Sequence, residues 1–546
     1  MKILVAEPLA PAALELLRSH PGWEVAEADA KTFERGLPDA DALVVRSAVK
    51  VTRDVIQQAP KLQLIGRAGV GVDNVDVEAA TEAGVLVMNT PGGNAVSVAE
   101  HTLALMLSLA RSVPQASAST KAGRWEKKKF LGNELRGKIL GVIGLGNVGR
   151  EVVRRAKGFD MRVVAHDPYV SSQAARDLDV ELAPLPDLFR QSDYITLHVA
   201  LTPETEHLLN AKTFAQMKPG VRIVNCARGE LIASDALASA IETGRVAGAA
   251  LDVFEKEPPS DDPVLRLDAV VATPHIAGST EEAQEAVGVR IADQIVEYLK
   301  NGVALNAVNM PALTAEQYRT LGPYIDLAER LGLFLSHIST GNAHTIRLFY
   351  FGRLADQNTQ ILRSSGIAGV LSRSLEHRAN LVNAMQIASQ RGFRVIEQRD
   401  PGRVHMDSIR MELESDAGVV SAMGAVVLAK PRLLEIEGIA CEATLDGNLM
   451  YARNDDVPGV IGFVGTVLGR SGINIANFAL GREETIANRA PHARPLTAIS
   501  IIETDEPVPK LVIDQLLEHD AIRLVRLVSF RATRPEGSSS YGNRNS

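Results

Sequence analysis

Short apolar runs alternate with helical spacings through the first 300 residues of the chain. In the first part, four such runs predict strands, at residues 3–6, 42–45, 62–65 and 85–88. Residues 12–19 lie between two of these runs and carry leucines at helical spacing. Strands that alternate with helices indicate a parallel sheet covered by helices on both faces.

The same alternation resumes after a long apolar helix predicted over 94–110. Six further runs predict the strands of a second parallel sheet, at residues 139–143, 161–165, 194–197, 221–225, 249–251 and 269–272. A helix over 281–300 follows, with Ser279 and Glu282 as its expected capping box.

We expect this last helix to return the chain to the first domain. Residues 1–95 and 285–305 then form a discontinuous domain, and residues 96–284 form a dinucleotide-binding domain between them.

The pattern changes beyond residue 312. Residues 315–447 predict a helix over 316–337, a strand over 345–351, a helix over 374–390 and turn-rich strands after it. This is a separate α+β module. Its basic residues either hold an anion or are scattered surface charges of a spacer, and the pattern leaves both open; they include Arg347, Arg378, Lys430 and Arg432.

Residues 448–530 predict strand, helix, two strands, helix and strand. This βαββαβ order is ferredoxin-like. The remaining residues, 531–546, are polar and rich in serine, so we expect a disordered tail.

Composition narrows the class of protein. A chain of 546 residues has room for three or four domains. The net charge of −8 argues against a nucleic-acid surface. The two cysteines fit a reducing cytoplasm, and no cluster of cysteine and histidine has metal spacing. The N-terminal run is too short for a signal peptide and no apolar stretch is long enough to span a bilayer.

A glycine turn follows the run at 139–143. Gly144, Gly146 and Gly149 have the GxGxxG spacing, which allows a tight turn, close approach of a pyrophosphate and close packing of helix on strand. Asp167 follows the next predicted strand, roughly 20 residues on, where a carboxylate accepts from the ribose hydroxyls of NAD. The alternative for Asp167 is an ordinary turn residue before proline.

Three residues that could catalyse hydride transfer each follow a strand of the same sheet. Arg228 can hold a carboxylate with two parallel hydrogen bonds, and His275 can take a hydroxyl proton. Glu257 can orient that histidine and stabilise its imidazolium. Taken singly, the three are also explained as surface charges and a loop histidine. Behind a glycine turn, they predict oxidation of a 2-hydroxy acid.

Two more features have chemical potential. Arg46 and the turn at Gly69–Gly71 lie at the carboxyl ends of predicted strands, where ligands bind in open α/β sheets, although Arg46 could equally be solvated. Residues 124–129 are rich in charge but contain Trp125, which makes an interface plausible.

Six segments make the chain similar to the D-isomer-specific 2-hydroxyacid dehydrogenases. They are RAGVGVDNVD (67–76), NTPGGNAVSVAEH (89–101), GLGNVG (144–149), NCARGELI (225–232), LDVFEKEP (251–258) and TPHIAGST (273–280). The resemblance implies α/β architecture: a flavodoxin-like substrate domain, a Rossmann domain, an intervening α+β domain and a C-terminal ACT domain.

The resemblance also implies the roles of residues. Arg228, Glu257 and His275 match the catalytic positions, and NAD is the implied cofactor. Arg46, Gly69, Val70 and Asn94 match substrate-binding positions, although Val70 replaces a threonine found in many relatives. Besides the glycines and Asp167, the positions that match the cofactor site are Asn147, Val148, Val199, Cys226, Ala227, Asp252 and Gly278.

Within the family, the chain resembles the long members that oxidise D-3-phosphoglycerate to 3-phosphohydroxypyruvate, the first step of L-serine biosynthesis. In these, the positions that match Asn454, Asp456 and Asn474 hold serine at an interface between two subunits. A homodimer or homotetramer is implied. Asn and Asp also favour turns for local reasons, so these three could be turn residues only. Two other functions stay open: a glyoxylate or hydroxypyruvate reductase, and a non-catalytic NAD-sensing module.

Overall fold

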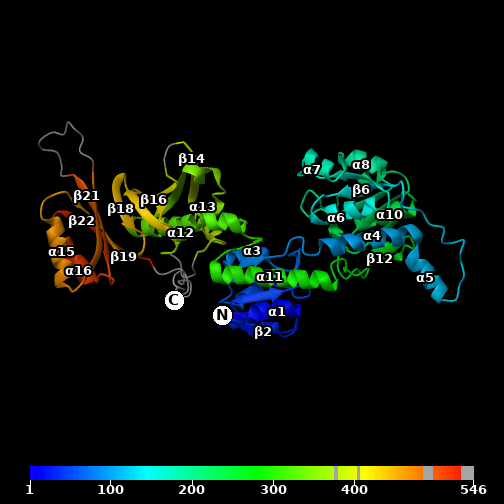
Figure 1. The fold of residues 1–546 in the computed structure, drawn as a ribbon, viewed down its shortest axis with the longest axis horizontal. Coiled ribbons are helices and arrows are strands. Elements are labelled where there is room, and N and C mark those ends of the chain that lie inside the picture. Colours follow the sequence, from blue (N-terminus) through cyan, green and yellow to red (C-terminus); the bar gives the residue numbers. More distant parts are fainter. Residues whose placement is uncertain (312, 374–378, 403–405, 484–495, 531–546) are drawn as a thin grey trace, which may run out of the picture.

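The computed structural model describes residues 1–311, 313–373, 379–402, 406–483 and 496–530. The molecule is elongated, and its described residues form four sheets (Figure 1). The first sheet lies between the second, at one end, and the two C-terminal sheets at the other. The predicted tail at 531–546 lies outside the described residues.

The first sheet has five parallel strands in the order β2-β1-β3-β4-β5, the flavodoxin-like order. The strands are β1 (Lys2–Val5), β2 (Glu24–Glu27), β3 (Ala42–Val45), β4 (Leu64–Arg67) and β5 (Leu86–Met88). The helices are α1 (Pro11–Arg18), η1 (Phe33–Asp39), α2 (Arg53–Gln57) and α3 (Val77–Glu82). Strand β2 was not predicted, because this edge strand buries no residue fully and so has no apolar run.

The second sheet is also parallel, in the order β12-β11-β10-β9-β6-β7-β8. Its strands are β6 (Ile139–Ile143), β7 (Arg162–His166), β8 (Glu181–Leu182), β9 (Tyr194–Leu197), β10 (Val221–Asn225), β11 (Val246–Leu251) and β12 (Val270–Ala272). Its helices are α4 (Ala95–Arg111), α5 (Val113–Lys121), α6 (Asn147–Lys157), α7 (Ser172–Asp177), α8 (Leu185–Gln191), α9 (Ala211–Gln216), η2 (Gly229–Leu231), α10 (Ser234–Glu242) and η3 (Pro263–Arg266). The two-residue strand β8 and helix α5 are additions to the prediction.

Helix α11 (Glu281–Asn301) carries the chain back to the first sheet. The side chains of Ile291 and Ile295 pack on the backbone of Gly66 in β4. The N-cap is Thr280, which accepts from Ala283 N at 3.1 Å, so the predicted box with Ser279 is wrong by one residue.

The segment after α11 covers the free edge of β5. Val308 N donates to Val87 O at 2.8 Å, and Asn309 Oδ1 accepts from Val87 N at 2.9 Å. A bridge also joins Met88 and Ala307. An open edge presents unpaired backbone groups, and this segment satisfies part of them.

The third sheet has six strands in the order β14-β13-β15-β16-β17-β18. They are β13 (Ala343–Phe351), β14 (Arg394–Asp400), β15 (Ser408–Ser415), β16 (Gly418–Val427), β17 (Lys430–Ile436) and β18 (Ile439–Thr444). Its helices are α12 (Ala315–Ile338), η4 (Gly352–Asp356), α13 (Gln360–Leu371) and α14 (Ala384–Gln390). The helix predicted over 374–390 is shorter where described: residues 379–383 are not helical, and residues 374–378 lie outside the described residues.

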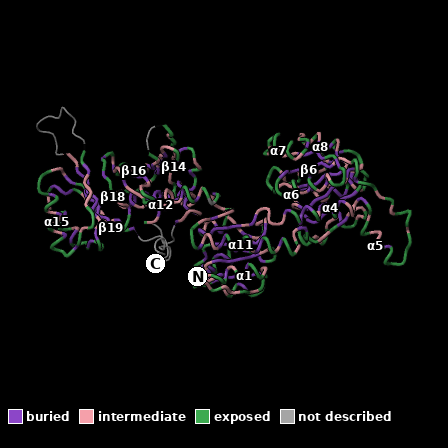
Figure 2. Tube along the Cα trace, viewed as in Figure 1, coloured by how far each residue is buried: buried purple, intermediate pink, exposed green. Residues whose placement is uncertain are grey.

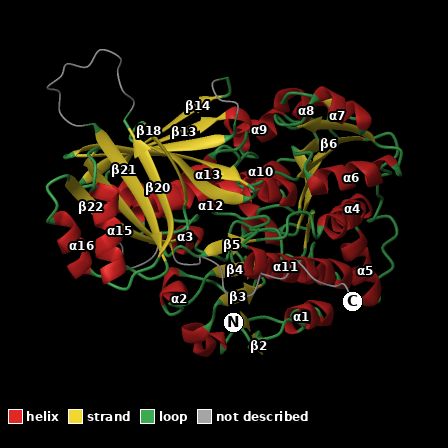
Figure 3. Ribbon diagram, turned by 60° about the vertical axis from the view of Figure 1, so that its left-hand side comes forward, coloured by secondary structure: helices red, strands yellow, loops and turns green. Residues whose placement is uncertain are grey.

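The fourth sheet confirms the βαββαβ order, with strands arranged β20-β21-β19-β22. Its elements are β19 (Gly447–Asp455), α15 (Val460–Arg470), β20 (Ile475–Arg482), β21 (Thr497–Thr504), α16 (Lys510–Leu517) and β22 (Ile522–Phe530). Helices α15 and α16 lie on one side, and the third sheet lies on the other (Figure 3). The rings of Phe334 in α12 and Tyr451 in β19 meet edge to face, 6.1 Å apart. Buried residues run through all four sheets (Figure 2).

Candidate active site

The three predicted catalytic residues follow three strands that are neighbours in the second sheet. Arg228 follows β10, Glu257 follows β11 and His275 follows β12. The turn at Gly229 packs directly on the backbone of Phe254 and Glu255, just before Glu257. The structure therefore brings these side chains to one edge of the sheet, where ligands bind in such folds.

His275 and Glu257 form a hydrogen-bonded pair. Nδ1 of His275 lies 2.7 Å from Oε2 of Glu257, and both side chains are partly open to solvent. His275 has a left-handed φ of 54°, which is uncommon for a residue other than glycine. Its backbone N donates to Asp252 O at 2.8 Å.

The carboxylate of Asp252 is fully buried and organises the loop that carries His275. Its Oδ1 accepts from Ile276 N at 2.9 Å, and its Oδ2 accepts from Ala277 N at 2.8 Å. Burial by itself would raise the pKa of Asp252. The hydrogen bonds from His101, Thr273 and these two backbone groups outweigh burial and lower that pKa.

Arg228 contacts the first domain. Its Nη1 donates to Ala227 O at 2.7 Å, and its Nη2 lies 3.1 Å from Oδ2 of Asp73 in the first domain. A Cβ placed on Gly71 would stand 2.2 Å from Nη2, so the guanidinium lies against the bare backbone of the Gly69–Gly71 turn.

Arg67, at the end of β4, is a residue that the sequence reasoning missed. Its guanidinium folds across Gly69, whose φ of 155° and missing side chain leave the room. Its Nε is buried and has no hydrogen-bond partner among the described residues. Burial lowers the pKa of Arg67; nearby Asp73 raises it, while the positive charges of Arg228 and Arg46 lower it further. The signal was present: Arg46 and Arg67 follow neighbouring strands at the same edge.

The other predicted substrate residues line the same region. Arg46 N donates to Glu7 Oε2 at 2.7 Å, and its Nη1 donates to Pro8 O at 3.2 Å. The carbonyl of Val70 accepts from the Asn89 amide. Asn94 precedes α4, and its amide lies against the backbone of Gly278, across the boundary between the domains.

The glycine turn fits a dinucleotide. A Cβ on Gly144 would stand 2.4 Å from His198 O, and one on Gly149 would stand 2.0 Å from Gly144 O. Gly146 faces open space and precedes α6, whose N-terminus has no side-chain cap. Asp167 Oδ2 accepts from Leu145 N at 2.8 Å, which fixes the carboxylate beside the turn. Close packing where it is needed and open backbone where a pyrophosphate approaches match the NAD site.

The remaining cofactor positions surround this turn. A side-chain carbon of Val199 packs on Gly144. The amide of Asn147 lies against Gly92, in the segment that connects β5 to α4. Val148 is half-buried in the first turn of α6. Cys226 is buried, which raises the pKa of its thiol to about 12, and Ala227 N donates to Asn225 Oδ1 at 3.0 Å.

The structure does not bring the three predicted effector residues together within one chain. Asn454 pairs with Ala498 at one end of β21, and Ile475, next to Asn474, pairs with Thr504 at the other end. At about 3.3 Å per residue, the two ends are roughly 20 Å apart. Strand β20 pairs with β21 and not with β19, so Asn474 does not lie beside the first strand of this sheet within one subunit.

Each of the three also has a local partner. Asn454 Nδ2 donates to Asp455 O at 2.8 Å, Asp456 lies 3.3 Å from Arg482, and Asn474 Nδ2 donates to Asp505 Oδ2 at 2.7 Å.

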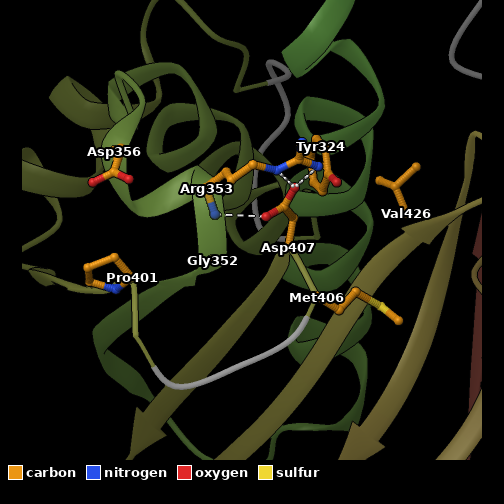
Figure 4. Close-up of a pocket in the computed structure, with 8 residues that line it drawn as sticks. All are labelled: Tyr324, Gly352, Arg353, Asp356, Pro401, Met406, Asp407 and Val426. Atoms are coloured by element: carbon orange, nitrogen blue, oxygen red, sulfur yellow. Dashed lines mark hydrogen bonds and ion pairs between the residues drawn. The ribbon is translucent and has the colours of Figure 1, made fainter.

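A separate cavity of about 550 Å³ lies in the third domain (Figure 4). Its wall carries Arg353, whose Nη2 donates to Asp407 Oδ2 at 2.7 Å. The charges of Arg353 and Asp407 neutralise each other. The cavity lies in a different domain from His275, which follows β12 of the second sheet. Of the four basic residues considered for an anion, Arg347 is paired with Glu414, and Arg378 lies outside the described residues.

Comparison with known proteins gives two family matches. Residues 103–277 match the D-isomer specific 2-hydroxyacid dehydrogenase NAD binding domain, and residues 320–437 match the D-3-phosphoglycerate dehydrogenase intervening domain. The D-3-phosphoglycerate dehydrogenase of Methanocaldococcus jannaschii is 44% identical over 531 residues, which cover 97% of this chain and 100% of that protein. The chain belongs to the D-3-phosphoglycerate dehydrogenase family.

Other members of this family also match this chain over most of its length. The proteins of that name from Archaeoglobus fulgidus and Bacillus subtilis are 42% and 37% identical, over 96% and 88% of this chain and 98% and 92% of their own. NAD is the cofactor.

Two solved structures each match a little over half of this chain. The TT0316 protein from Thermus thermophilus (TM-score 0.52, 34% identity) covers 56% of this chain and 100% of its own. A glyoxylate reductase from Paecilomyes thermophila (TM-score 0.51, 30% identity) covers 58% of this chain and 99% of its own. In the described residues, no helix has the length and hydropathy to cross a membrane.

Proposed function

We propose that the enzyme oxidises D-3-phosphoglycerate to 3-phosphohydroxypyruvate with NAD, the first step of L-serine biosynthesis. The observation that carries the proposal is the placement of Arg67 and Arg228 at the Gly69–Gly71 turn, with Arg46 close enough to lower the pKa of Arg67. Asp73 and Glu7 are the acidic groups that face Arg67, and the Glu7 carboxylate already accepts from three backbone N–H groups. The cluster therefore holds an excess of positive charge, which suits a substrate with two anionic groups.

The roles follow from position. Arg228, beside the catalytic pair, holds the carboxylate, and Arg67 with Arg46 holds the phosphate. Because the Glu257 carboxylate accepts from Nδ1 of His275, the neutral ring leaves Nε2 free to take the hydroxyl proton. Glu257 stabilises the imidazolium that forms. NAD, held at the glycine turn and Asp167, accepts the hydride.

Two alternatives are weaker. A glyoxylate or hydroxypyruvate reductase needs only the first two domains, whereas relatives that match this chain throughout are named D-3-phosphoglycerate dehydrogenase. An NAD-sensing module has no need of the His275–Glu257 pair.

The deciding experiment follows NADH formation by the intact chain with D-3-phosphoglycerate, D-glycerate and D-lactate, and NADH consumption with glyoxylate and hydroxypyruvate. We expect kcat/KM for the phosphorylated acid to exceed that for D-glycerate at least about 100-fold, since charged hydrogen bonds contribute about 1.5–3 kcal/mol each. His275→Ala serves as the control and should lose about 10²–10⁴ in kcat. A preference for glyoxylate selects the reductase, and no turnover with any substrate selects the sensor.

We further propose a homodimer or homotetramer in which the arm, residues 113–134, contacts a second copy. The arm stands at the far end of the second domain, and Trp125 and Leu131 in it are 80% and 92% exposed (Figures 1 and 2). Large exposed apolar side chains on a projecting segment favour an interface.

A second copy also bears on the effector. Since Asn454 and Asp456 lie at one end of the fourth sheet and Asn474 at the other, a serine site built from all three needs two chains. We propose that L-serine binds there and inhibits the enzyme.

We also propose residues 1–95 with 285–305, 96–284, 315–447 and 448–530 as the domain bounds. We also propose a cytoplasmic location, which the buried free thiols Cys226 and Cys441 support because such thiols suit a reducing compartment.

A further inference from the structure

His101 is a titratable side chain that the proposed reaction does not use. It contacts Asp252, whose carboxylate holds the loop that carries His275. It is on α4, and its side chain is 20% exposed. Its Nε2 lies 3.1 Å from Thr273 Oγ1 and 3.4 Å from Asp252 Oδ1. Both partners belong to the group of atoms that holds His275 in place.

The hydrogen bonds of Thr273 fix the direction of this contact. The Thr273 hydroxyl donates to Asp252 Oδ1 at 2.6 Å, and an ionised carboxylate cannot donate in return. The Thr273 proton is thus committed, so Thr273 Oγ1 must accept from His101. Nε2 of His101 therefore carries a proton, and a chain of donors runs from His101 through Thr273 to Asp252.

The chain ends at the loop that aims His275. Asp252 uses one carboxylate oxygen for Thr273 and Ile276 N and the other for Ala277 N. These bonds keep His275 at its left-handed φ, a strained conformation for a residue with a side chain, which the surrounding contacts must hold in place. The left-handed turn in turn places Nδ1 on Glu257.

The same face of α4 makes a second contact with this segment, which provides a comparison. Ser97, one helical turn before His101, has its Oγ 2.8 Å from Thr280 Oγ1 at the start of α11. That contact joins the helix to the end of the segment and does not touch Asp252. Replacing Ser97 therefore tests the packing of α4 on this segment in general, whereas replacing His101 tests the contact that reaches Asp252 and His275.

We propose that His101 is a positioning residue for proton transfer at His275, acting through Thr273 and Asp252, and this inference rests on the proposed oxidation. His101 donates to the Thr273 hydroxyl and so fixes its orientation. The Thr273 hydroxyl in turn donates to the Asp252 carboxylate, which can only accept. A displaced loop moves Nε2 of His275 relative to the substrate hydroxyl. A misplacement of about 1 Å costs on the order of 10² in rate.

The test compares four variants of the intact enzyme: His101→Leu, which removes the donor; His101→Gln, whose amide places a donor near the Nε2 position; Thr273→Val, which breaks the chain in the middle; and Ser97→Ala. The measurements are kcat, KM, the isotope effect with substrate deuterated at C2, the dissociation constant of NADH and the thermal midpoint.

We expect His101→Leu and Thr273→Val to lower kcat about 10- to 100-fold. The isotope effect should rise, because chemistry becomes limiting, while KM and NADH affinity change little. His101→Gln should recover most of kcat, and Ser97→Ala should keep it.

Native kcat in His101→Leu, or in Thr273→Val should the leucine variant not fold, overturns the inference and leaves the proposed function intact. The inference also fails if His101→Gln is as slow as His101→Leu with an equal loss of thermal midpoint, since His101 is then only a packing residue. If the unmodified enzyme oxidises no hydroxy acid, the proposed function fails first and the inference fails with it.

Discussion

The guanidinium of Arg67 lies across Gly69, which has no side chain, and its Nε has no hydrogen-bond partner among the described residues. Replacing it with glutamine removes a charged contact to the phosphate. We expect KM for D-3-phosphoglycerate to rise about 10- to 150-fold, with KM for D-glycerate nearly unchanged. Arg53→Gln is the matched control, because Arg53 is paired with Glu82 on the outside of the same domain. An equal rise for both substrates contradicts the phosphate assignment.

Asp167 decides the coenzyme at the same scale. Its carboxylate is fixed by Leu145 N and Tyr169 N and should accept from the ribose hydroxyls while repelling a 2′-phosphate. Asp167→Ala should lower kcat/KM with NAD roughly 10- to 150-fold. The ratio of kcat/KM with NAD to kcat/KM with NADP should therefore fall. Steady-state kinetics with both coenzymes measure this. If the unmodified enzyme uses NADP as well as NAD, the role given to Asp167 is wrong.

At the scale of elements, the side chain of Asn309 satisfies several backbone groups at the outer edge of β5. Asn309 accepts from Val87 N and donates to Val85 O and Thr81 Oγ1, at 2.9, 2.9 and 3.1 Å. Asn309→Ala leaves part-buried backbone groups unpaired, which should cost about 1–3 kcal/mol. Thermal unfolding should show a lower midpoint, and the Val87 amide should exchange faster. Asn301→Ala, which loses one contact with Glu297 on the surface, should change neither.

At the scale of the whole molecule, the arm has two predicted tasks. Trp125→Ala should weaken the proposed dimer, which light scattering during size-exclusion chromatography can show. Lys127, Lys128 and Lys129 are exposed on the arm and would face the phosphate of the neighbouring site. Replacing all three with alanine should raise KM for the phosphorylated substrate more than for D-glycerate. An equal effect on both leaves the lysines as a solvated face.

Regulation is also a property of the assembly. L-serine should inhibit the intact enzyme, and Asp456→Ala should remove the inhibition, with a coupling free energy of about 1–3 kcal/mol between the sites. Inhibition should also weaken in a Trp125→Ala variant that no longer assembles, if assembly brings the fourth sheets together. No effect of serine on activity and no binding by calorimetry remove serine as the effector.

The sequence by itself determined the fold class and the positions of most strands in the first, second and fourth sheets, whereas the mostly buried helix α13 was not predicted. The buried strands have apolar runs because both faces of a parallel sheet are covered, and Gly144, Gly146 and Gly149 are spaced by local geometry. Arg228, Glu257 and His275 could be predicted because each lies within a few residues after a strand of one sheet. Strand β2, strand β8 and helix α5 escaped prediction since they bury little apolar surface and so leave no strong periodicity.

Only the tertiary structure decided which distant side chains share a space. Arg67 joins Arg228 because the first domain folds against the second, and His101 reaches Asp252 because α4 packs against β11 and its neighbouring strands. Asn474 lies away from Asn454 because β21 inserts between their strands. Hydrophobic period and turn chemistry act over a few neighbours in sequence, whereas these contacts join residues tens or hundreds of positions apart and depend on the packing of whole elements.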